Sequence, residues 1–198
     1  MTELKRGEGR DALVQATVDL LREGHAIQVK EVAARAGVSH TLIYRHFPDG
    51  GKEELIAEAY AELFKGLVLE DMDELLTLVE NGAIDRERLR AYGMRLLSPG
   101  RDEVRGLRLD ALAQVRLNPY LAPRIGRARQ DLVAGVAEAF VQVVPHLPKA
   151  TAIAIAVLHQ GVPLGVTAIG GASMSRATRE AVADMWADSF LALLDRVR

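Results

Sequence analysis

Apolar residues recur along this chain with the three-to-four-residue spacing of amphipathic helices, and glycine, proline and asparagine interrupt the pattern. Between residues 11 and 23, for example, Leu13, Thr17 and Leu20 share one face, and Gly24 follows. The two-residue alternation that marks strands is absent. Aromatic residues make up only 5% of the chain, so we expect a core of Leu, Val, Ala and Ile. The pattern predicts an all-α fold.

The interruptions divide the rest of the chain into further helices. They are expected at residues 29–36, 39–47, 51–79, 86–97, 102–117, 120–144, 149–169 and 175–197. Asp85 is placed to cap the helix that starts at Arg86. The helix from residue 51 leaves the N-terminal segment and enters the remainder of the chain. We therefore expect it to be the mechanical connector between two parts of the protein.

The segment from residue 29 to 47 predicts two short helices separated by a glycine turn. Gly37 supplies the positive φ that a tight stop requires, and Ser39 is placed to cap the second helix, in which Ile43 and Phe47 face inward. The opposite side carries His40, Thr41, Tyr44 and Arg45. Hydrogen-bond donors, an aromatic hydroxyl and a cation on one helix face suit the DNA major groove. As a bare pattern, an ordinary helical corner with a polar outside is about equally compatible.

The amino-acid sequence of this segment resembles the DNA-binding domain of the TetR family of transcriptional regulators. The residues that carry the resemblance are Val29, Glu31, Val32, Ala33, Ala36, Gly37, Val38, Ser39, Ile43, Tyr44, His46 and Phe47, followed by Lys52-Glu53-Glu54-Leu55. It covers residues 10–59, and beyond them it rests on the layout of helices. Gln28 stands where the family usually has Thr or Ser, and the link formed by residues 48–51 is longer than usual.

The resemblance implies a division of the chain and a set of DNA contacts. Residues 1–50 would form a three-helix DNA-binding domain with the helix-turn-helix, and residues 51–198 a helical domain for effector binding and dimerisation. The implied DNA-binding residues are Gln28, Val29, Ser39, His40, Thr41, Leu42, Tyr44, Arg45, His46 and Lys52. Of these, Tyr44, His46 and Lys52 would hold the DNA backbone. His40, Thr41 and Leu42 would meet bases. The family commonly has a small residue, often Gly, where Thr41 stands and Thr or a small polar residue where Leu42 stands, so its operator sequences cannot be transferred to this chain.

Composition narrows the function without naming it. The net charge of −2 argues against a protein that coats nucleic acid generally, and leaves room for a site-specific binder with a few local cations. There is no cysteine, the five histidines lack metal-ligand spacing, and no cofactor or metal motif is present. The polar N-terminus is unlike a signal peptide, so a cytoplasmic protein is expected. Lys5, Arg6 and Arg10 could reach a phosphate from a loose arm.

Residues 150–172 are nearly free of charge and long enough to span a bilayer. His159, Gln160 and Pro163 interrupt the segment and no belt of Trp and Tyr flanks it, so a membrane span is rejected. In the family resembled, the last two helices form a four-helix bundle with a second subunit, which explains a helix without a wet face. The expected homodimer interface is Gly161, Gly165, Val182, Met185, Trp186, Ser189, Phe190 and Leu193.

Polar groups within apolar helices are the candidates for binding a small, largely apolar organic effector. They are His159, Gln160, Tyr92, Met94, Arg108, Gln114 and Tyr120. His159 and Gln160 are equally compatible with the dimer seam. The leading hypothesis is a homodimeric repressor that leaves a palindromic double-stranded operator when an effector binds. One alternative is an all-helical enzyme or ligand-binding protein with an incidental helix-turn-helix, although no nucleophile and base for an enzyme can be assembled from the sequence. Another is a helix-turn-helix protein that acts through protein contacts.

Overall fold

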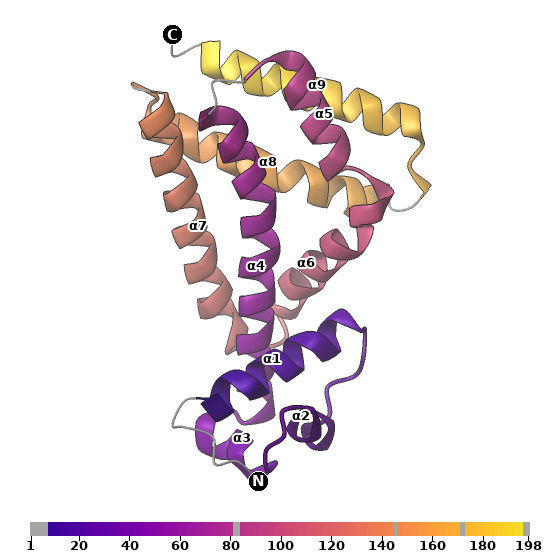
Figure 1. Cartoon of the computed structure of the whole chain (residues 1–198), viewed down its shortest axis with the longest axis vertical. Coiled ribbons are helices and arrows are strands. Elements are labelled where there is room, and N and C mark those ends of the chain that lie inside the picture. The colour runs from indigo at the N-terminus through magenta and orange to yellow at the C-terminus, as the bar shows by residue number, and fades with distance from the viewer. Residues whose placement is uncertain (1–7, 81–83, 145, 171–172, 196–198) are drawn as a thin grey trace. The chain divides into compact units, whose positions relative to one another are not determined.

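The computed structural model describes residues 8–80, 84–144, 146–170 and 173–195, and within them every regular element is a helix (Figure 1). The elements are α1 (Glu8–Arg22), α2 (Val29–Arg35), α3 (Thr41–His46), α4 (Lys52–Glu80), α5 (Arg86–Leu96), the short 3-10 helix η1 (Pro99–Arg101), α6 (Asp102–Gln114), α7 (Leu121–Val143), α8 (Lys149–Ile169) and α9 (Arg176–Asp195). The predicted all-α fold is confirmed. The predicted arm residues Lys5 and Arg6 lie outside the described residues, whereas Arg10 belongs to the first turns of α1.

Several helix ends follow local chemistry that the sequence shows. The carboxylate of Asp85 accepts the backbone N–H of Arg88 at 2.8 Å, which confirms the predicted cap of α5. Gly24 and Gly37 adopt positive φ values of 71° and 67° after α1 and α2. The end of α6 differs from the prediction, because α6 stops at Gln114 rather than continuing to residue 117.

The chain separates into two compact units that interleave in sequence. Unit 1 contains residues 1–65 and 110–128, and unit 2 contains residues 66–109 and 129–198. Three helices, α4, α6 and α7, therefore contribute residues to both units. The expected division at residue 50 concerns function and stays a prediction.

Unit 1 is built around α1, which packs on α2 and α3 (Figure 1). Leu13 and Leu20 of α1 are fully buried, as are Val32 of α2 and Ile43 of α3. At the outer ends of α1 and α2, the guanidinium of Arg35 donates to both carboxylate oxygens of Glu23, at 2.6 and 2.9 Å. The apolar stripe predicted for residues 11–23 thus forms the centre of the three-helix unit.

Unit 2 has an antiparallel pair, α8 and α9, with α5 packed across α9 (Figure 1). Gly93 of α5 allows this approach, since a Cβ there would lie 3.3 Å from the Cβ of Ala183. Below the turn after α5, the buried Arg105 donates to Thr167 Oγ1 at 2.6 Å and to the carbonyl oxygen of Ser98 at 2.9 Å. These contacts tie α6 to α8 and to the end of α5.

Among the described residues, α8 is the one helix whose length and apolar composition would suit a membrane span. It continues through Pro163, which lies inside the helix. Ala152, Ile155, Ala156 and His159 are buried within unit 2. A core helix of a folded domain passes the same composition test, and its packing on α9 agrees with the rejection of a membrane span.

Candidate nucleic-acid interface and a buried polar cluster

The helix-turn-helix consists of α2, the turn at Gly37 and α3. The inward residues of α3 are Ile43 and, directly after its end, Phe47, and both are fully buried. The guanidinium of Arg10 lies 5.1 Å from the centroid of the Phe47 ring, at a distance where cation–π attraction applies. Packing on one side of α3 therefore leaves its other side free to face a partner.

The start of α3 differs in detail from the predicted serine cap. The position before the helix is His40, which has an α-helical backbone, and α3 begins at Thr41. The Ser39 hydroxyl lies 2.9 Å from the Thr41 hydroxyl and accepts the Thr41 N–H at 3.4 Å. Ser39 thus still supplies a hydrogen-bond acceptor to the helix start, one residue further out than expected. Before α2, Gln28 has an extended backbone and makes no side-chain cap.

The predicted DNA-binding residues differ in how far the fold exposes them. Six of them are exposed, namely Gln28, Ser39, His40, Thr41, Tyr44 and Arg45. The other four, Val29, Leu42, His46 and Lys52, are half-buried. We call the exposed side chains of Ser39, His40, Thr41, Tyr44 and Arg45 the recognition face. Tyr44 is 57% exposed, which places an aromatic hydroxyl at the surface where a phosphate or a base edge can accept its proton.

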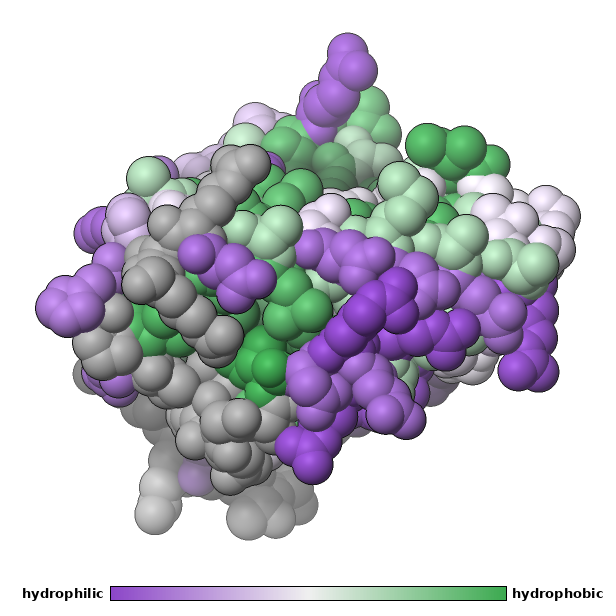
Figure 2. All heavy atoms as spheres, turned by 90° about the horizontal axis from the view of Figure 1, so that it is seen from above, coloured by the Kyte–Doolittle hydropathy of each residue, from purple (hydrophilic) through white to green (hydrophobic). Residues whose placement is uncertain are grey.

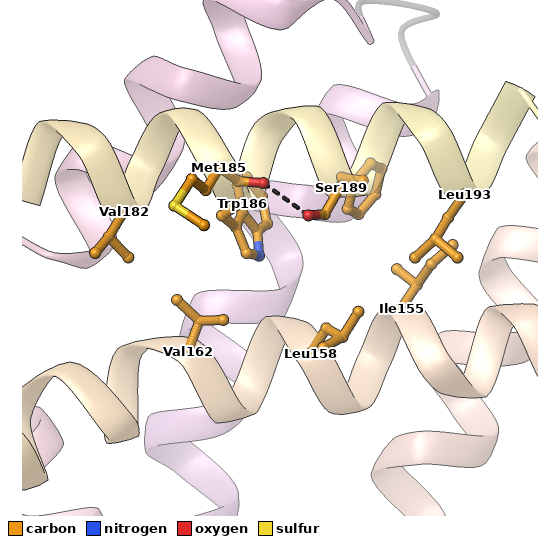
Figure 3. Close-up of a pocket in the computed structure, with 9 residues that line it drawn as sticks. Ile155, Leu158, Val162, Val182, Met185, Trp186, Ser189 and Leu193 are labelled. Atoms are coloured by element: carbon orange, nitrogen blue, oxygen red, sulfur yellow. Dashed lines mark hydrogen bonds between the residues drawn. The ribbon is translucent and has the colours of Figure 1, made fainter.

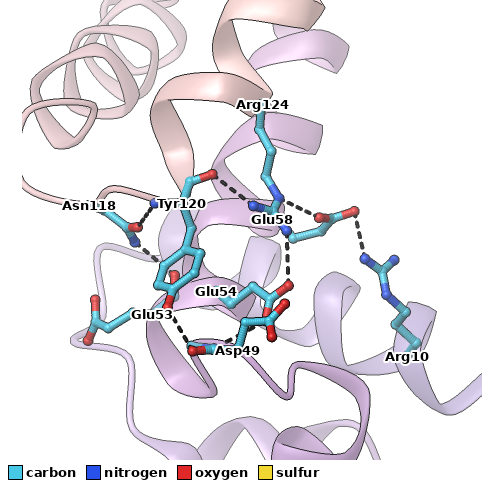
Figure 4. A network of polar contacts seen from close by, with 9 residues as sticks. Arg10, Asp49, Glu53, Glu54, Glu58, Asn118, Tyr120 and Arg124 are labelled. Carbon is cyan, nitrogen blue, oxygen red and sulfur yellow. Dashed lines mark hydrogen bonds and ion pairs between the residues drawn. The ribbon is translucent and has the colours of Figure 1, made fainter.

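The link between α3 and α4 is held by two tyrosine rings. Gly51 has φ of 54°, and a Cβ there would come within 2.9 Å of the Tyr44 ring. A Cβ on Gly50 would lie 2.5 Å from the Tyr120 ring, while the Tyr120 hydroxyl donates to the carbonyl oxygen of Asp49 at 2.7 Å (Figure 4). Glycine is required at both positions for the link to pass this closely. The longer link noted in the sequence is therefore an ordered turn.

Arg124, at the start of α7, binds the first turns of α4 (Figure 4). Arg124 donates to Glu58 at 2.8 Å, to Glu54 at 3.1 Å and to the carbonyl oxygen of Tyr120 at 2.8 Å, and its side chain is 22% exposed. Arg10 of α1 reaches the other oxygen of Glu58 at 3.0 Å. Burial alone would raise the pKa of Glu58, but the hydrogen bonds from Arg124 and Arg10 outweigh it and hold that pKa below its usual value. We call Arg10, Glu54, Glu58 and Arg124 the α4–α7 network.

Unit 2 carries an apolar groove between α8 and α9, with a volume of about 270 Å³ (Figure 3). It is lined by Ile155, Leu158, Val162, Val182, Met185, Trp186, Ser189, Phe190 and Leu193. Trp186 and Phe190 are buried within the chain, whereas Met185 is 71% exposed. The one polar side chain of this lining, Ser189, donates its hydroxyl proton back to the carbonyl oxygen of Met185 at 2.8 Å. Figure 2, a view of the molecule from above, shows apolar side chains in patches beside hydrophilic ones.

Four polar side chains meet in the interior of unit 2, and we call Tyr92, Arg108, His159 and Gln160 the polar cluster. The Tyr92 hydroxyl lies 3.2 Å from His159 Nε2, and the two rings stack with centroids 5.7 Å apart. Arg108 donates through Nη2 to Gln160 Oε1. Burial, and secondly the positive charge of Arg108, lower the pKa of His159 to about 3, so this imidazole is neutral at physiological pH.

Sequence comparison identifies the N-terminal part of the chain. A family model described as "Bacterial regulatory proteins, tetR family" matches residues 13–59, which contain most of α1, all of α2 and α3 and the start of α4. Residues 13–59 belong to the TetR family, and they contain the helix-turn-helix that carries the recognition face. The chain is therefore a DNA-binding transcriptional regulator. Among curated protein sequences, none matches this chain.

Solved structures share the fold over nearly the whole chain. A TetR-family transcriptional regulator from Mesorhizobium loti MAFF303099 aligns with a TM-score of 0.66 and 21% identity, covering 96% of this chain and 98% of that one. A transcriptional regulator from Rhodococcus sp. RHA1 aligns with a TM-score of 0.61 and 18% identity over 96% of each chain. At these identities the likeness concerns the fold alone. It shows that the helices after residue 59 also follow the TetR-family layout.

The structure brings together four of the seven side chains that were predicted to bind an effector, namely those of the polar cluster. Met94 is half-buried on α5, and Gln114 and Tyr120 belong to unit 1, where Tyr120 supports the link before α4. Sequence reasoning missed Arg124 and Asn118. Asn118 accepts the Tyr120 N–H at 3.0 Å and donates to the carbonyl oxygen of Glu53 at 2.8 Å. In the sequence, only the helix-breaking Asn-Pro pair at residue 118 pointed to these contacts.

Proposed function

We propose that this TetR-family regulator is a homodimeric repressor of transcription, without catalytic activity, that acts in the cytoplasm. It would bind a palindromic double-stranded operator and leave it when a small organic effector binds. The observation that carries the proposal is the recognition face: five exposed polar or aromatic side chains on and directly before a short helix whose other side is fully buried. A helix presented in this way fits the DNA major groove.

A second copy of the chain is the occupant we propose for the α8/α9 groove. Besides Met185, the pair exposes Val157 and Leu158 of α8, which are 55% and 45% exposed. A Cβ added to Gly161 or Gly165 would meet nothing within 4 Å, so helices can approach closely there. Two α8–α9 pairs packed face to face would cover these side chains and complete a four-helix bundle.

Substitutions at exposed groove residues test the dimer without disturbing the protomer. Met185→Glu and Leu158→Glu should raise the dimer dissociation constant at least about tenfold, because a charge would be buried without a partner. Phe190 is unsuitable for this test, since it is 3% exposed and its ring lies 5.5 Å from that of Trp186. Val141→Glu, at an exposed position of α7, is the matched control. Light scattering should give twice 21.6 kDa for the unmodified protein and the control. A 21.6 kDa particle for the unmodified chain would refute the dimer.

Dimerisation and DNA reading are linked by geometry. The two recognition helices must be about 34–36 Å apart to enter successive major grooves of a palindrome. An effector that binds better to a dimer with another spacing must weaken DNA binding by the same factor. We therefore expect fluorescence anisotropy with the DNA upstream of the coding sequence to show tight, salt-dependent binding, and a reporter under that DNA to be silenced. If the protein bound this DNA but reporter expression did not change, the proposal of repression would be wrong and the proposal of DNA binding would remain.

Separate substitutions distinguish backbone contacts from base contacts. Lys52→Ala should weaken binding to all sequences alike and flatten its salt dependence, because a phosphate contact is lost. Thr41→Ala should change base preference at one operator position, with loss of about 1–3 kcal/mol of discrimination. Lys30→Ala, at an exposed cation of α2, is the control for a general loss of positive charge. If Thr41→Ala left the preference unaltered at every position, its base contact would be wrong.

A further inference from the structure

The polar cluster of unit 2 presents hydrogen-bond donors that have no acceptor. Among the described residues, the buried atoms without a hydrogen-bond partner include His159 Nδ1 and Gln160 Nε2. The Gln160 amide is oriented by its oxygen, which accepts from Arg108, so its NH₂ group is the unpaired end. A buried donor without a partner destabilises a protein by about 1–3 kcal/mol. Two such donors on adjacent residues require an explanation.

The tautomer of His159 follows from its contact with Tyr92. The phenol O–H is the better donor of this pair and an unprotonated imidazole nitrogen the better acceptor, so Tyr92 donates to Nε2 across 3.2 Å. A neutral imidazole carries its single proton on the other nitrogen. His159 Nδ1 is therefore an N–H donor. Both unpaired atoms of the cluster are donors, and a molecule that satisfies them must offer acceptors.

The electrostatic surroundings select an anion over a neutral acceptor. Arg108 is 1% exposed, and its positive charge adds to burial, the larger cause, in lowering the pKa of the His159 imidazole. A carboxylate offers two oxygens with about four acceptor positions and a negative charge, so one group can serve both donors beside the guanidinium. Aromatic rings also adjoin the cluster. Trp186 lies 6.0 Å from His159 and 5.7 Å from Tyr92 between ring centroids, which suits an apolar body attached to the carboxylate.

We propose that the effector of this regulator is an organic acid whose carboxylate binds between His159 Nδ1–H and Gln160 Nε2–H beside Arg108. The inference rests on the proposed function, since it names the chemical class of the molecule that would release the operator. The inference also makes the sequence-based prediction of a largely apolar effector more specific, because the effector would keep its apolar body and carry an anionic carboxylate.

Trp186 provides a direct readout, because it is the single tryptophan of the chain and touches the cluster. Benzoate, phenylacetate and octanoate would each be titrated against the full-length protein beside its neutral methyl ester. We expect at least one acid to change Trp186 emission and raise the thermal midpoint, with an affinity roughly 10- to 100-fold above that of its ester, as charge-assisted hydrogen bonds imply. Esters that bind as well as the acids, or no response to any acid at 10 mM ligand (on the order of the weakest useful affinity), would overturn the proposal.

Two variants locate the carboxylate. Gln160→Glu keeps the side-chain shape and supplies a built-in carboxylate next to Arg108, so it should raise the midpoint of the free protein and weaken acid binding at least about tenfold. Gln130→Glu, at an exposed position of α7, controls for the added charge. His159→Phe retains a stacking ring without the donor and should also lose acid binding while it unfolds cooperatively. Acid binding that survives both changes would overturn the assignment, as would a crystal structure soaked with acid that holds only water at these atoms.

The DNA-binding assay separates this inference from the proposed function. If an acid binds beside Trp186 and the operator is released, both stand. If an acid binds and DNA binding is unchanged, the effector role fails and the carboxylate site remains. If only neutral compounds release the DNA, ligand-controlled repression stands and the carboxylate assignment is wrong.

Discussion

Removing Arg124 from the α4–α7 network should weaken unit 1 by a measurable and pH-dependent amount. Arg124→Met retains most of the aliphatic volume and deletes three hydrogen bonds, two of them to carboxylates (Figure 4). The side chains of Arg124, Glu54 and Glu58 are 22%, 13% and 21% exposed, which places them between surface ion pairs and buried ones. Exposed pairs contribute at most about 1 kcal/mol and broken buried pairs cost about 3–5 kcal/mol. We expect a loss of about 2 kcal/mol.

Thermal unfolding followed by circular dichroism measures this loss. For a chain of this length, about 2 kcal/mol corresponds to a fall of about 4–8 °C in the midpoint. Arg127→Met is the matched control, because Arg127 is exposed on the same helix and its replacement should change the free energy of unfolding by less than about 0.5 kcal/mol. If Arg124→Met lowered the midpoint no more than Arg127→Met, the network would not stabilise unit 1.

The pH dependence gives a second, independent check. The folded-state pKa of Glu58 lies below the ordinary value of 4.5, so its ionised form is favoured by folding. Its contribution is complete above that ordinary value and is lost as the pH falls through the lowered pKa of the folded state. The difference between the unmodified protein and Arg124→Met should therefore be largest near pH 7 and shrink below pH 4.5. A difference that stays constant, or grows on acidification, would refute the electrostatic origin.

Two further changes test the link and a helix cap. Gly50→Ala should lower the free energy of unfolding by about 1–3 kcal/mol, because the new Cβ would lie 2.5 Å from the Tyr120 ring. Tyr120→Leu in the same chain should restore part of this loss, measured by urea unfolding. Equal losses with and without Tyr120 would exclude the clash. Asp85→Ala should lower the free energy of unfolding by about 1 kcal/mol through loss of the α5 cap, whereas Asp85→Ser should retain most of it; identical midpoints for the two would contradict the capping role.

The features that were predictable from the sequence depend on neighbours along the chain. Helical periodicity gave the bounds of α8 as residues 149–169, and the Asp85 cap needs only a partner three residues away. The inward side of α3 follows from the spacing of Ile43 and Phe47, so the recognition face could be named before its geometry was known. Local rules failed at the end of α6. Leu117 would have continued the apolar pattern, but it is 75% exposed and α6 has already ended.

The contacts that could not be predicted join residues far apart in sequence. Arg124 is 66 positions from Glu58 and 70 from Glu54, and Tyr120 is 71 from Asp49. The sequence shows that a polar side chain on a helix needs a hydrogen-bond partner, but it does not show which residue will be that partner. Tyr120 was therefore grouped with the effector candidates. The polar cluster was accessible in part, because His159 and Gln160 stand out in an apolar helix, but the donor character of their free nitrogens depends on Tyr92 and Arg108 from other helices.

The assignment of residues 110–128 to unit 1 changes how the DNA-binding part of this regulator is built. Three short or medium helices with a small core are only marginally stable alone, and the family match ends at residue 59. The start of α7 adds Arg124 across the first turns of α4 and Tyr120 across the link that precedes it. Because that link follows directly from the end of α3, its two glycines and the two tyrosine rings above them limit how α3 can move on α4. Tyr120, which lies outside the helix-turn-helix motif and more than sixty positions downstream, therefore helps Tyr44 to limit how the recognition face is oriented.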